Sequence, residues 1–494
     1  MVKFSMQNFT PLLPGFHLQT LRRKPRSASQ ILADKMERLK QKSISQLGVC
    51  FDKFIPKECL KSTESGHLSR NRFFNKENIF WAFFSQVLDA DGGCQEVVRK
   101  LQACAAMRSK PLPSSSTSAY CQARIKLDQE SLHEILQHTS TRLQKKVDTG
   151  RLNGRRVIVV DGTGVSMPDT KQNQEIWPQQ VSQKPGCGFP QAALCACFCL
   201  QTGALLSYEE GNKKSHELPM LRKQIDTFKS TDIFLGDKGF CSYFDVSNFK
   251  DRGVDCVFTL ARRLPVTEVE AIKVLGEDDL LIHWKKPVRT KASSYSQEDW
   301  EQLPETLSLR QIKVTVDQPG FRTTSFHIIT TLLDAQEYPA EEIAELYFQR
   351  WDVELFFRDI KTTMGMDILR CRTPDMVRKE IIMHLIVYNC IRCLMLEAAQ
   401  KKAHSVREVS FKGSIQALRQ WEPHLNQGNI NKQKRYRLMQ LLYESITGKI
   451  IVDRPGRSEP RAVKRRPKHY QLLTAPRHEM EEIKHRSKYR AKQA

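Results

Sequence analysis

The spacing of apolar residues changes from helix-like to strand-like near residue 150. Before that point, apolar positions recur every three or four residues, as in Ile79, Phe80, Phe83, Phe84 and Val87, which is typical of amphipathic helices. A Pro/Ser-rich stretch over 112–118 is typical of a loop. The first part of the chain is therefore predicted to be helical, with helices over 29–45, 76–107, 117–126 and 128–147.

Short β-branched runs then alternate with helical patterns. Strands are predicted at 156–161, 192–200, 204–209, 232–236 and 254–261, with helices at 215–228 and 240–251. This order predicts a mixed α/β core. Residues 262–333 are charged and strand-like throughout, with strands at 279–284, 307–316 and 321–333 and no substantial helix, which predicts a β-rich insertion. Helical patterns return over 339–364, after Pro339 and two acidic residues, and over 374–402.

These patterns divide the chain into four parts. We expect a helical N-terminal domain, a mixed α/β domain in two segments, the β-rich insertion between them, and a basic, helical C-terminal region; their bounds are 1–150, 151–261 with 334–415, 262–333, and 416–494.

Charge points to a polyanionic partner. The formal net charge is +23 and the pI is near 9.5. Cations concentrate at Arg22–Arg26 and along the tail 454–494. The alternative interpretation is that the excess of positive charge on the two tails only makes the protein more soluble.

A cytosolic location is expected, with no membrane contact. No run approaches about 18 apolar residues, and the apolar stretch 381–396 is interrupted by His384, Asn389 and Arg392, so it predicts a buried helix. Cysteines are then expected to be reduced. Cys195, Cys197 and Cys199 alternate along a strand, which favours core packing over a zinc site because no partner ligands stand at finger spacing.

One polar stripe lies on the helix predicted at 339–364. Tyr347, Arg350, Glu354 and Lys361 fall within an arc of roughly 60° at about 100° per residue. An apolar stripe on the same helix, formed by Leu346, Val353 and Phe357, can hold it against a core. A carboxylate, two cations and a phenol suit a metal ion and a nucleic-acid phosphate, with Arg350 offering a bidentate fork and Lys361 a point charge. A solvated helix face is the alternative.

Two upstream acids complete a candidate metal site. Asp161 and Asp237 are each predicted at the end of a buried strand, where side chains from neighbouring strands converge. With Glu354 they offer three hard oxygen ligands for two Mg²⁺ ions, with Mn²⁺ as a possible substitute. Each Asp alone is also typical of a turn before Gly, and Asp169, Asp232 and Asp359 compete for the same roles.

Neighbouring residues are candidates for DNA contacts. Lys238 follows Asp237 directly, and Trp351 beside Arg350 can either stack on an exposed base or pack in the core. Trp284 is expected to pack on the sheet, and His216 to begin a helix.

The signature Tyr347-x₂-Arg350-x₃-Glu354-x₆-Lys361 resembles that of the DDE transposases of bacterial insertion sequences, in particular insertion sequence family 4. The segments around Asp161 (Val-Val-Asp-Gly-Thr) and Asp237 (Leu-Gly-Asp-Lys-Gly-Phe) are similar to the family's first two catalytic segments. Further similar stretches at 118–124 and 457–468 extend the resemblance to most of the chain.

The resemblance implies an α/β fold with an RNase H-like catalytic core, in which Asp161, Asp237 and Glu354 carry two Mg²⁺ ions. Water would cleave DNA at the element's ends, and the freed 3′-hydroxyl would attack the other strand or the target DNA. The N-terminal region would bind the terminal inverted repeats, and a homodimer would form in a synaptic complex. Relatives that pass through a DNA hairpin hold a flipped base between two tryptophans. Trp351 matches the first, whereas the late insertion strand around Phe326 carries no tryptophan.

Two other functions remain open from the sequence. A non-catalytic DNA-binding descendant would bind element ends without cleaving them. A metal-dependent nuclease would cleave DNA without joining the ends.

Overall fold

The computed structural model describes the chain in segments, all of them within one compact unit, Ser45–Ala494. They are residues 50–61, 68, 73–107, 111–145, 151–212, 215–260, 269–289, 295–316, 324–425, 430–451, 475, 479–483 and 488–491. The helix expected at 29–45 and most of the basic tail lie outside these residues.

A nine-stranded mixed sheet organises the structure, in the order β3-β2-β1-β4-β5-β9-β8-β7-β6. β1 pairs in parallel with β4, and β4 with β5, whereas every other neighbouring pair is antiparallel. The first five strands, with helices on both faces, form the RNase H-like core. The strand bounds are β1 Val157–Ser166, β2 Gln191–Cys199, β3 Leu205–Asn212, β4 Ile233–Leu235, β5 Asp255–Leu260, β6 Val269–Gly276, β7 Asp279–Lys285, β8 Thr306–Val316 and β9 Thr324–Thr330.

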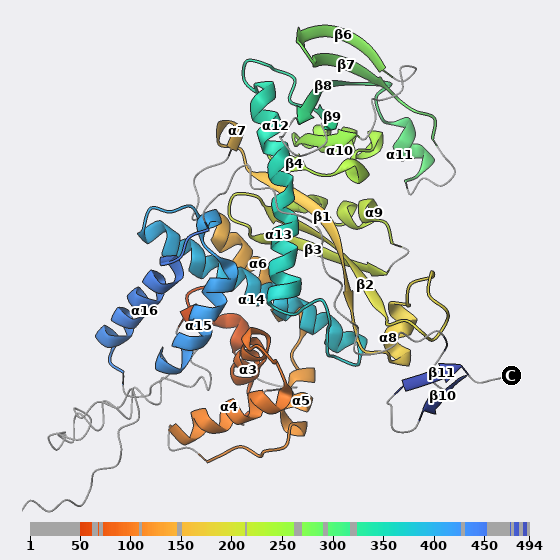
Figure 1. The fold of residues 1–494 in the computed structure, drawn as a ribbon. Coiled ribbons are helices and arrows are strands. Elements are labelled where there is room, and N and C mark those ends of the chain that lie inside the picture. Colours follow the sequence, from red (N-terminus) through yellow and green to blue (C-terminus); the bar gives the residue numbers. More distant parts are fainter. Residues whose placement is uncertain are drawn as a thin grey trace, which may run out of the picture. The chain divides into compact units, whose positions relative to one another are not determined.

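The strands of the expected β-rich insertion extend this core sheet, because β9 pairs with β5 (Figure 1). The strand β6 was not predicted. A short helix, α11 Gln297–Glu301, lies between β7 and β8 and begins with a capping box at Ser296. No substantial helix was expected here, and α11 has only five residues; it forms because a serine three residues before an aspartate satisfies the first amides of a helix.

Helices precede the sheet as predicted. They are α3 Lys76–Leu88, α4 Cys94–Met107, α5 Ser118–Ile125 and α6 Gln129–Gln144. The single helix predicted over 76–107 is wrong, because the chain turns at Gly92, whose φ of +60° is left-handed. A side chain there would also lie 2.9 Å from the carbonyl oxygen of Gln86.

Two helical layers enclose the core strands. On one face of β2, Phe198 packs against Phe356, Phe357 and Tyr388. On the other side of the core, Phe234 of β4 packs against Phe249 of helix α10, Tyr243–Asp251. The predicted helix 215–228 is shorter than expected: α9 covers Glu217–Arg222, and a 3₁₀ turn follows at Ile225–Thr227.

The signature helix follows one path with changes of pitch (Figure 1). α12 Ala340–Phe348 passes through a 3₁₀ turn, Gln349–Trp351, into α13 Asp352–Arg358, and a π-helical turn, Asp359–Thr363, ends it. The predicted apolar stripe is confirmed, since Leu346, Val353 and Phe357 are all buried.

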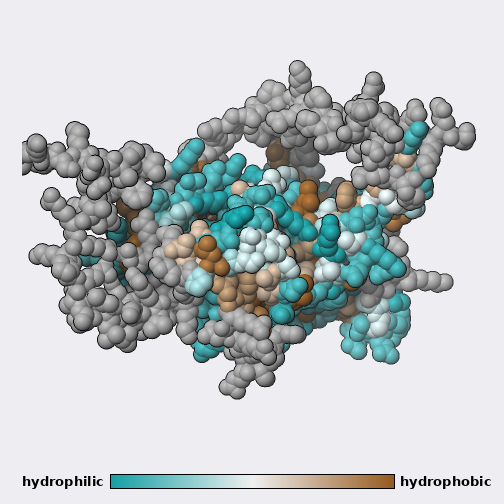
Figure 2. Space-filling model, turned by 90° about the horizontal axis from the view of Figure 1, so that it is seen from below, coloured by the Kyte–Doolittle hydropathy of each residue, from teal (hydrophilic) through white to brown (hydrophobic). Residues whose placement is uncertain are grey.

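The longest helix, α14 Pro374–Lys401, is mostly enclosed by the protein, with 22 of its 28 residues buried. It is long and apolar enough to cross a membrane, but 94% of its most apolar window is buried inside the protein, as in the core helix of a soluble protein. Helices α15 Phe411–Leu425 and α16 Lys432–Thr447 follow it. Figure 2 shows one side of the molecule as mostly hydrophilic, with hydrophobic residues in a central patch and a few scattered spots.

The three alternating cysteines of β2 are buried core residues, as predicted. Trp284 in β7 is buried and packs edge-on against Tyr243, which confirms that it is a packing residue.

Candidate active site

The site forms where β1 and β4 separate. The last pair of residues joining these parallel strands is Val159 with Leu235, so Asp161 and Asp237 each follow it by two residues and lie at the same edge. Asp237 follows the end of β4 as predicted. The prediction that Asp161 ends its strand is wrong. β1 continues to Ser166 because the backbone beyond Asp161 still pairs with β2, although Gly162 interrupts the apolar pattern.

Local hydrogen bonds orient both aspartates. The Asp161 carboxylate accepts a hydrogen bond from its neighbour's amide, Gly162 N, at 2.8 Å. Asp237 accepts one from Gly239 N at 2.8 Å and caps the short 3₁₀ turn Lys238–Phe240. After Leu235, β4 no longer pairs with β1, and Gly236 N instead donates a hydrogen bond to the carbonyl oxygen of Val257 in β5.

The signature residues reach this edge from α12, α13 and the turns that follow them. Arg350 lies between two carboxylates: its Nη1 is 3.6 Å from Asp161 Oδ2, and its Nη2 is 4.0 Å from Glu354 Oε1. Lys361 Nζ donates to Thr163 Oγ1 on β1 at 3.1 Å. Tyr347 lies near Arg350 and Thr259 of β5, which partly offset the effect of burial on its pKa. The one-sided stripe therefore faces the sheet edge despite the changes of pitch.

The carboxylates influence one another's protonation. Burial is the largest cause that raises the pKa of Asp161, and Asp237 and Glu354 add to it, whereas the Gly162 amide and Arg350 lower it. Burial also raises the pKa of Tyr347. The pKa of Asp161 is therefore raised even beside an arginine, because burial together with the two neighbouring carboxylates outweighs the guanidinium and the amide.

The three competing acids have other partners. Asp232 is buried and accepts a hydrogen bond from Arg156 Nε at 2.9 Å. Asp359 is buried, where burial raises its pKa to about 6 and the nearby Arg392 and Arg358 partly offset this. Asp169 accepts a hydrogen bond from Gln174 Nε2 at 2.9 Å.

Two candidate DNA-contact residues are exposed, and each lies close in sequence to one of the carboxylates. Trp351 is 59% exposed, so the core-packing alternative is wrong for this residue. Lys238 is exposed next to Asp237. Phe326 of β9 lies 5.7 Å from the Tyr347 ring, between centroids.

The chemistry of the donor set fits a divalent cation. Three carboxylates from separate elements are hard oxygen ligands, and the Arg350 guanidinium stands in for a cation between two of them. As the side chains are placed, no three His, Cys, Asp or Glu residues in the described segments lie close enough to hold an ion. A cation would therefore have to displace Arg350 from Asp161 and Glu354.

A further acid, Glu217, lies at this edge and was missed from the sequence. It is the first residue of α9, after His216, which begins the helix as expected. Burial raises the pKa of Glu217, and Asp161 and Asp237 raise it further. The only sequence signal was Gly162, whose missing side chain leaves room for the Glu217 carboxylate.

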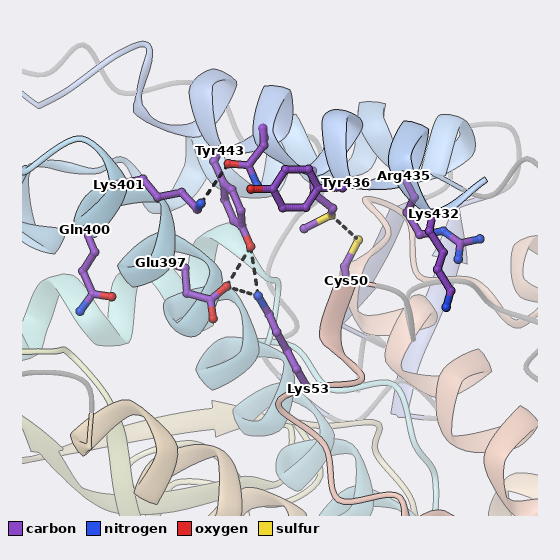
Figure 3. Close-up of a pocket in the computed structure, with 11 residues that line it drawn as sticks. Cys50, Lys53, Glu397, Gln400, Lys401, Lys432, Arg435, Tyr436 and Tyr443 are labelled. Atoms are coloured by element: carbon purple, nitrogen blue, oxygen red, sulfur yellow. Dashed lines mark hydrogen bonds and ion pairs between the residues drawn. The ribbon is translucent and has the colours of Figure 1, made fainter. Parts of the chain in front are cut away.

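A separate basic pocket of about 650 Å³ lies among the Cys50–Lys53 segment, the end of α14 and α16 (Figure 3). Lys53 pairs with Glu397, and Tyr443 Oη donates to the same carboxylate at 2.8 Å. Lys432, Arg435 and the exposed Tyr436 line the pocket from the first turns of α16.

Comparisons with known proteins show that the chain is similar to transposases. Residues 152–390 match the family model described as a transposase DDE domain. The chain is 25% identical over 441 residues to the transposase InsG of insertion sequence element IS4 from Escherichia coli (strain K12), covering 88% of this chain and 94% of InsG. It is 28% identical over 142 residues to a probable transposase of element IS5377 from Geobacillus stearothermophilus, covering 27% and 36%.

Among solved structures, the chain is similar to a piggyBac transposase in a synaptic complex with hairpin DNA. The TM-score is 0.40 with 12% identity, and the match covers 83% of this chain and 86% of the other. The DDE domain coincides with the segment that carries Asp161, Asp237 and Glu354, and the similarity to the IS4 transposase extends through both chains. The matching DDE domain and the similarity to the IS4 transposase support an insertion sequence 4 family DDE transposase.

Proposed function

We propose that this transposase binds the terminal inverted repeats of its insertion sequence, cleaves DNA at the element ends and joins the 3′-hydroxyl ends to target DNA. The observation that carries the proposal is the meeting of Asp161, Asp237 and the Arg350–Glu354 pair at one sheet edge. In the reaction, water attacks a phosphodiester bond at the element's end, and the freed 3′-hydroxyl then attacks a second phosphodiester.

DDE transposases use divalent metal ions. We assign Asp161, Asp237 and Glu354 as the ligands of two Mg²⁺ ions, with Mn²⁺ able to substitute. When bound, such ions lower the pKa of water and stabilise charge on the leaving oxygen. Backbone amides hold the Asp161 and Asp237 carboxylates, whereas Arg350 has to leave Asp161 and Glu354 before these two can receive the ions.

The cations beside the carboxylates position the DNA. Arg350 has planar donors for a bidentate contact with a phosphate, and Lys361 adds a point charge above β1. Tyr347 and Lys238 add donors to the backbone of the cleaved strand. Trp351 offers an exposed ring on which a base from an opened end can stack.

Other surfaces bind DNA away from the site. We assign inverted-repeat recognition to residues 1–150 and further DNA backbone contacts to 416–494. The basic pocket supports the second assignment, because Lys432 and Arg435 lie at the helix end where backbone amides already favour an anion. Basic residues there oppose the helix dipole, which is a cost that a bound phosphate offsets. The enzyme would act in the cytoplasm, as a homodimer in the synaptic complex.

The test uses DNA that carries the ends flanking the protein's own gene. We expect cuts at the element boundary with Mg²⁺, none with EDTA, and none for Asp161→Ala. Asp169→Ala is the matched control, since it removes a nearby acid that bonds Gln174 and should leave cleavage intact.

The products separate the alternatives. Joined products in a strand-transfer assay support transposition, whereas cut but unjoined ends would identify a nuclease. Tight binding without any metal-dependent cut would identify a non-catalytic DNA-binding protein and refute the proposal. A slowly migrating hairpin product would add that excision passes through a DNA hairpin.

A further inference from the structure

The inference concerns Glu217, which reaches the candidate active site from the opposite face of the sheet to α13. Successive residues of β1 point to alternate faces, so Asp161 faces the signature helix and Gly162 faces α9. An added Cβ at Gly162 would lie 1.7 Å from Glu217 Oε1 and 2.5 Å from its Cδ. The Glu217 carboxylate therefore lies directly against the backbone beside Asp161.

The end of β4 opens this position to both faces. Beyond Val159 and Leu235, β1 is no longer paired with β4, although it stays paired with β2 as far as Ser166, so the sheet is open on the β4 side of Asp161 and Gly162. The contact with Gly162 brings the Glu217 carboxylate to the residue that follows Asp161. Burial raises the pKa of Glu217, and the negative charges of Asp161 and Asp237 raise it further.

Glu217 is only partly exposed, and among the residues that the structure describes no lysine or arginine forms an ion pair with it. A carboxylate that is partly removed from water and faces two others raises the free energy of the metal-free protein. A divalent cation at the opening would offset this repulsion.

A purely structural role makes a different prediction. A glutamate in the first turn of a helix interacts favourably with the helix dipole, by about 0.3–1 kcal/mol at an exposed site. α9 has only six residues, and its N-terminal residue is partly buried against Gly162 rather than exposed. The dipole explains neither the close contact with Gly162 nor the coupling to the two aspartates.

We propose that Glu217 is a fourth carboxylate ligand of the divalent metal site, approaching from the face opposite to Glu354. The proposal rests on the assignment of Asp161 and Asp237 as metal ligands. It also explains why glycine follows Asp161, since any side chain at position 162 would occupy the place of the Glu217 carboxylate.

The test measures Mn²⁺ binding to the full-length protein without DNA, by the electron paramagnetic resonance signal of the free ion. Glu217→Gln should weaken binding by at least about tenfold, the lower end of the effect of losing a group that supports a metal site. Gly162→Ala retains every charge but displaces the carboxylate, and should weaken binding in the same way. Glu130→Gln, which removes an exposed first-turn acid of α6, is the matched control and should change nothing.

Thermal unfolding gives a second readout that does not depend on activity. Without metal, Glu217→Gln should raise the melting temperature, because it removes repulsion, and the increase caused by Mn²⁺ should shrink. A lower melting temperature with unchanged Mn²⁺ affinity would assign Glu217 to the helix dipole and overturn the proposal.

Asp161→Asn separates this failure from that of the proposed function. If Asp161→Asn loses Mn²⁺ and Glu217→Gln binds it as the wild type does, only the fourth ligand is refuted. If Asp161→Asn binds Mn²⁺ as tightly as the wild type, the assignment of the whole metal site fails.

Discussion

Arg350 should oppose metal binding while promoting DNA cleavage. In the metal-free protein its guanidinium lies between Asp161 and Glu354, at 3.6 and 4.0 Å, and takes the place of a cation. A divalent ion bound to the same oxygens would either be repelled by this group or have to break both ion pairs. Arg350→Gln keeps a polar side chain and removes the charge, so we expect it to bind Mn²⁺ more tightly than the wild type.

The distances set the size of the effect. Two unit charges about 4 Å apart interact by about 1 kcal/mol at the dielectric constant of water, and by about 4 kcal/mol at an effective value of 20. Glu354 is 45% exposed, so screening is strong and the smaller figure applies. Because the metal ion carries two charges, its repulsion by Arg350 is twice this figure, about 2 kcal/mol. Removing that repulsion corresponds to roughly thirtyfold tighter binding of the ion. We therefore expect a gain of about ten- to thirtyfold.

The same variant should cleave DNA poorly. A hydrogen bond to a charged group contributes about 1.5–3 kcal/mol, so losing the phosphate contact should slow end cleavage by roughly 10- to 150-fold. Affinity for unrelated DNA should fall far less. The assay pairs a Mn²⁺ titration with cleavage on a denaturing gel, and Arg358→Gln, an exposed arginine on the same helix, is the control. Weaker Mn²⁺ binding by Arg350→Gln would refute the reasoning, because Arg350 would then help to build the metal site.

Three further predictions follow from other contacts. Glu354→Gln should bind element ends in a gel-shift assay as the wild type does but show no metal-dependent cleavage, because it removes a ligand charge with little change of shape; retained cleavage would exclude Glu354 as a ligand. Replacing both Lys432 and Arg435 by glutamine should reduce the slope of log affinity for DNA against log salt by about 2, because each phosphate contact contributes about 0.9; an unchanged slope would remove the basic pocket from the DNA path. The pKa of Asp359 is raised to about 6, so its contribution to stability is fully present below pH 3.8 and is lost as the pH rises through 6. Asp359→Asn should therefore be more stable than the wild type above about pH 7, by up to about 3 kcal/mol for a pKa raised by roughly two. Guanidinium unfolding at pH 4 and pH 8 measures this difference in stability, and an equal difference at the two pH values would contradict the prediction.

Most elements of the core could be predicted from the sequence because their apolar runs are continuous. Three irregular features were not predicted, each for a physical reason. The turn at Gly92 lies in a stretch with helical composition on both sides, and only a left-handed φ reveals it. β1 continues past Asp161 by pairing its backbone with β2, which leaves no trace in side-chain polarity. The pairing of β9 with β5 depends on contacts between distant segments, which local patterns do not contain.

The residues of the candidate site were easier to predict where they lie close to one another in the sequence. The spacing of Arg350, Glu354 and Lys361 lies within one helical path, so the sequence alone places them together. Asp161 and Asp237 were found through their positions relative to strands. Glu217 was missed because a first-turn acid is common on any helix, and its significance depends on the glycine that faces it across the sheet.

The buried helix α14 has a consequence for synthesis on the ribosome. α6 packs against α14 and ends at Gln144, whereas α14 begins at Pro374, about 230 residues later. At roughly 5–20 residues per second, α6 waits on the order of 10–50 s for the helix that covers it, and the more deeply buried α3, which ends at Leu88, waits longer. During that time their apolar faces are open to the crowded cell, so the yield of folded protein should depend on chaperones and should improve when translation and growth are slowed by cooling.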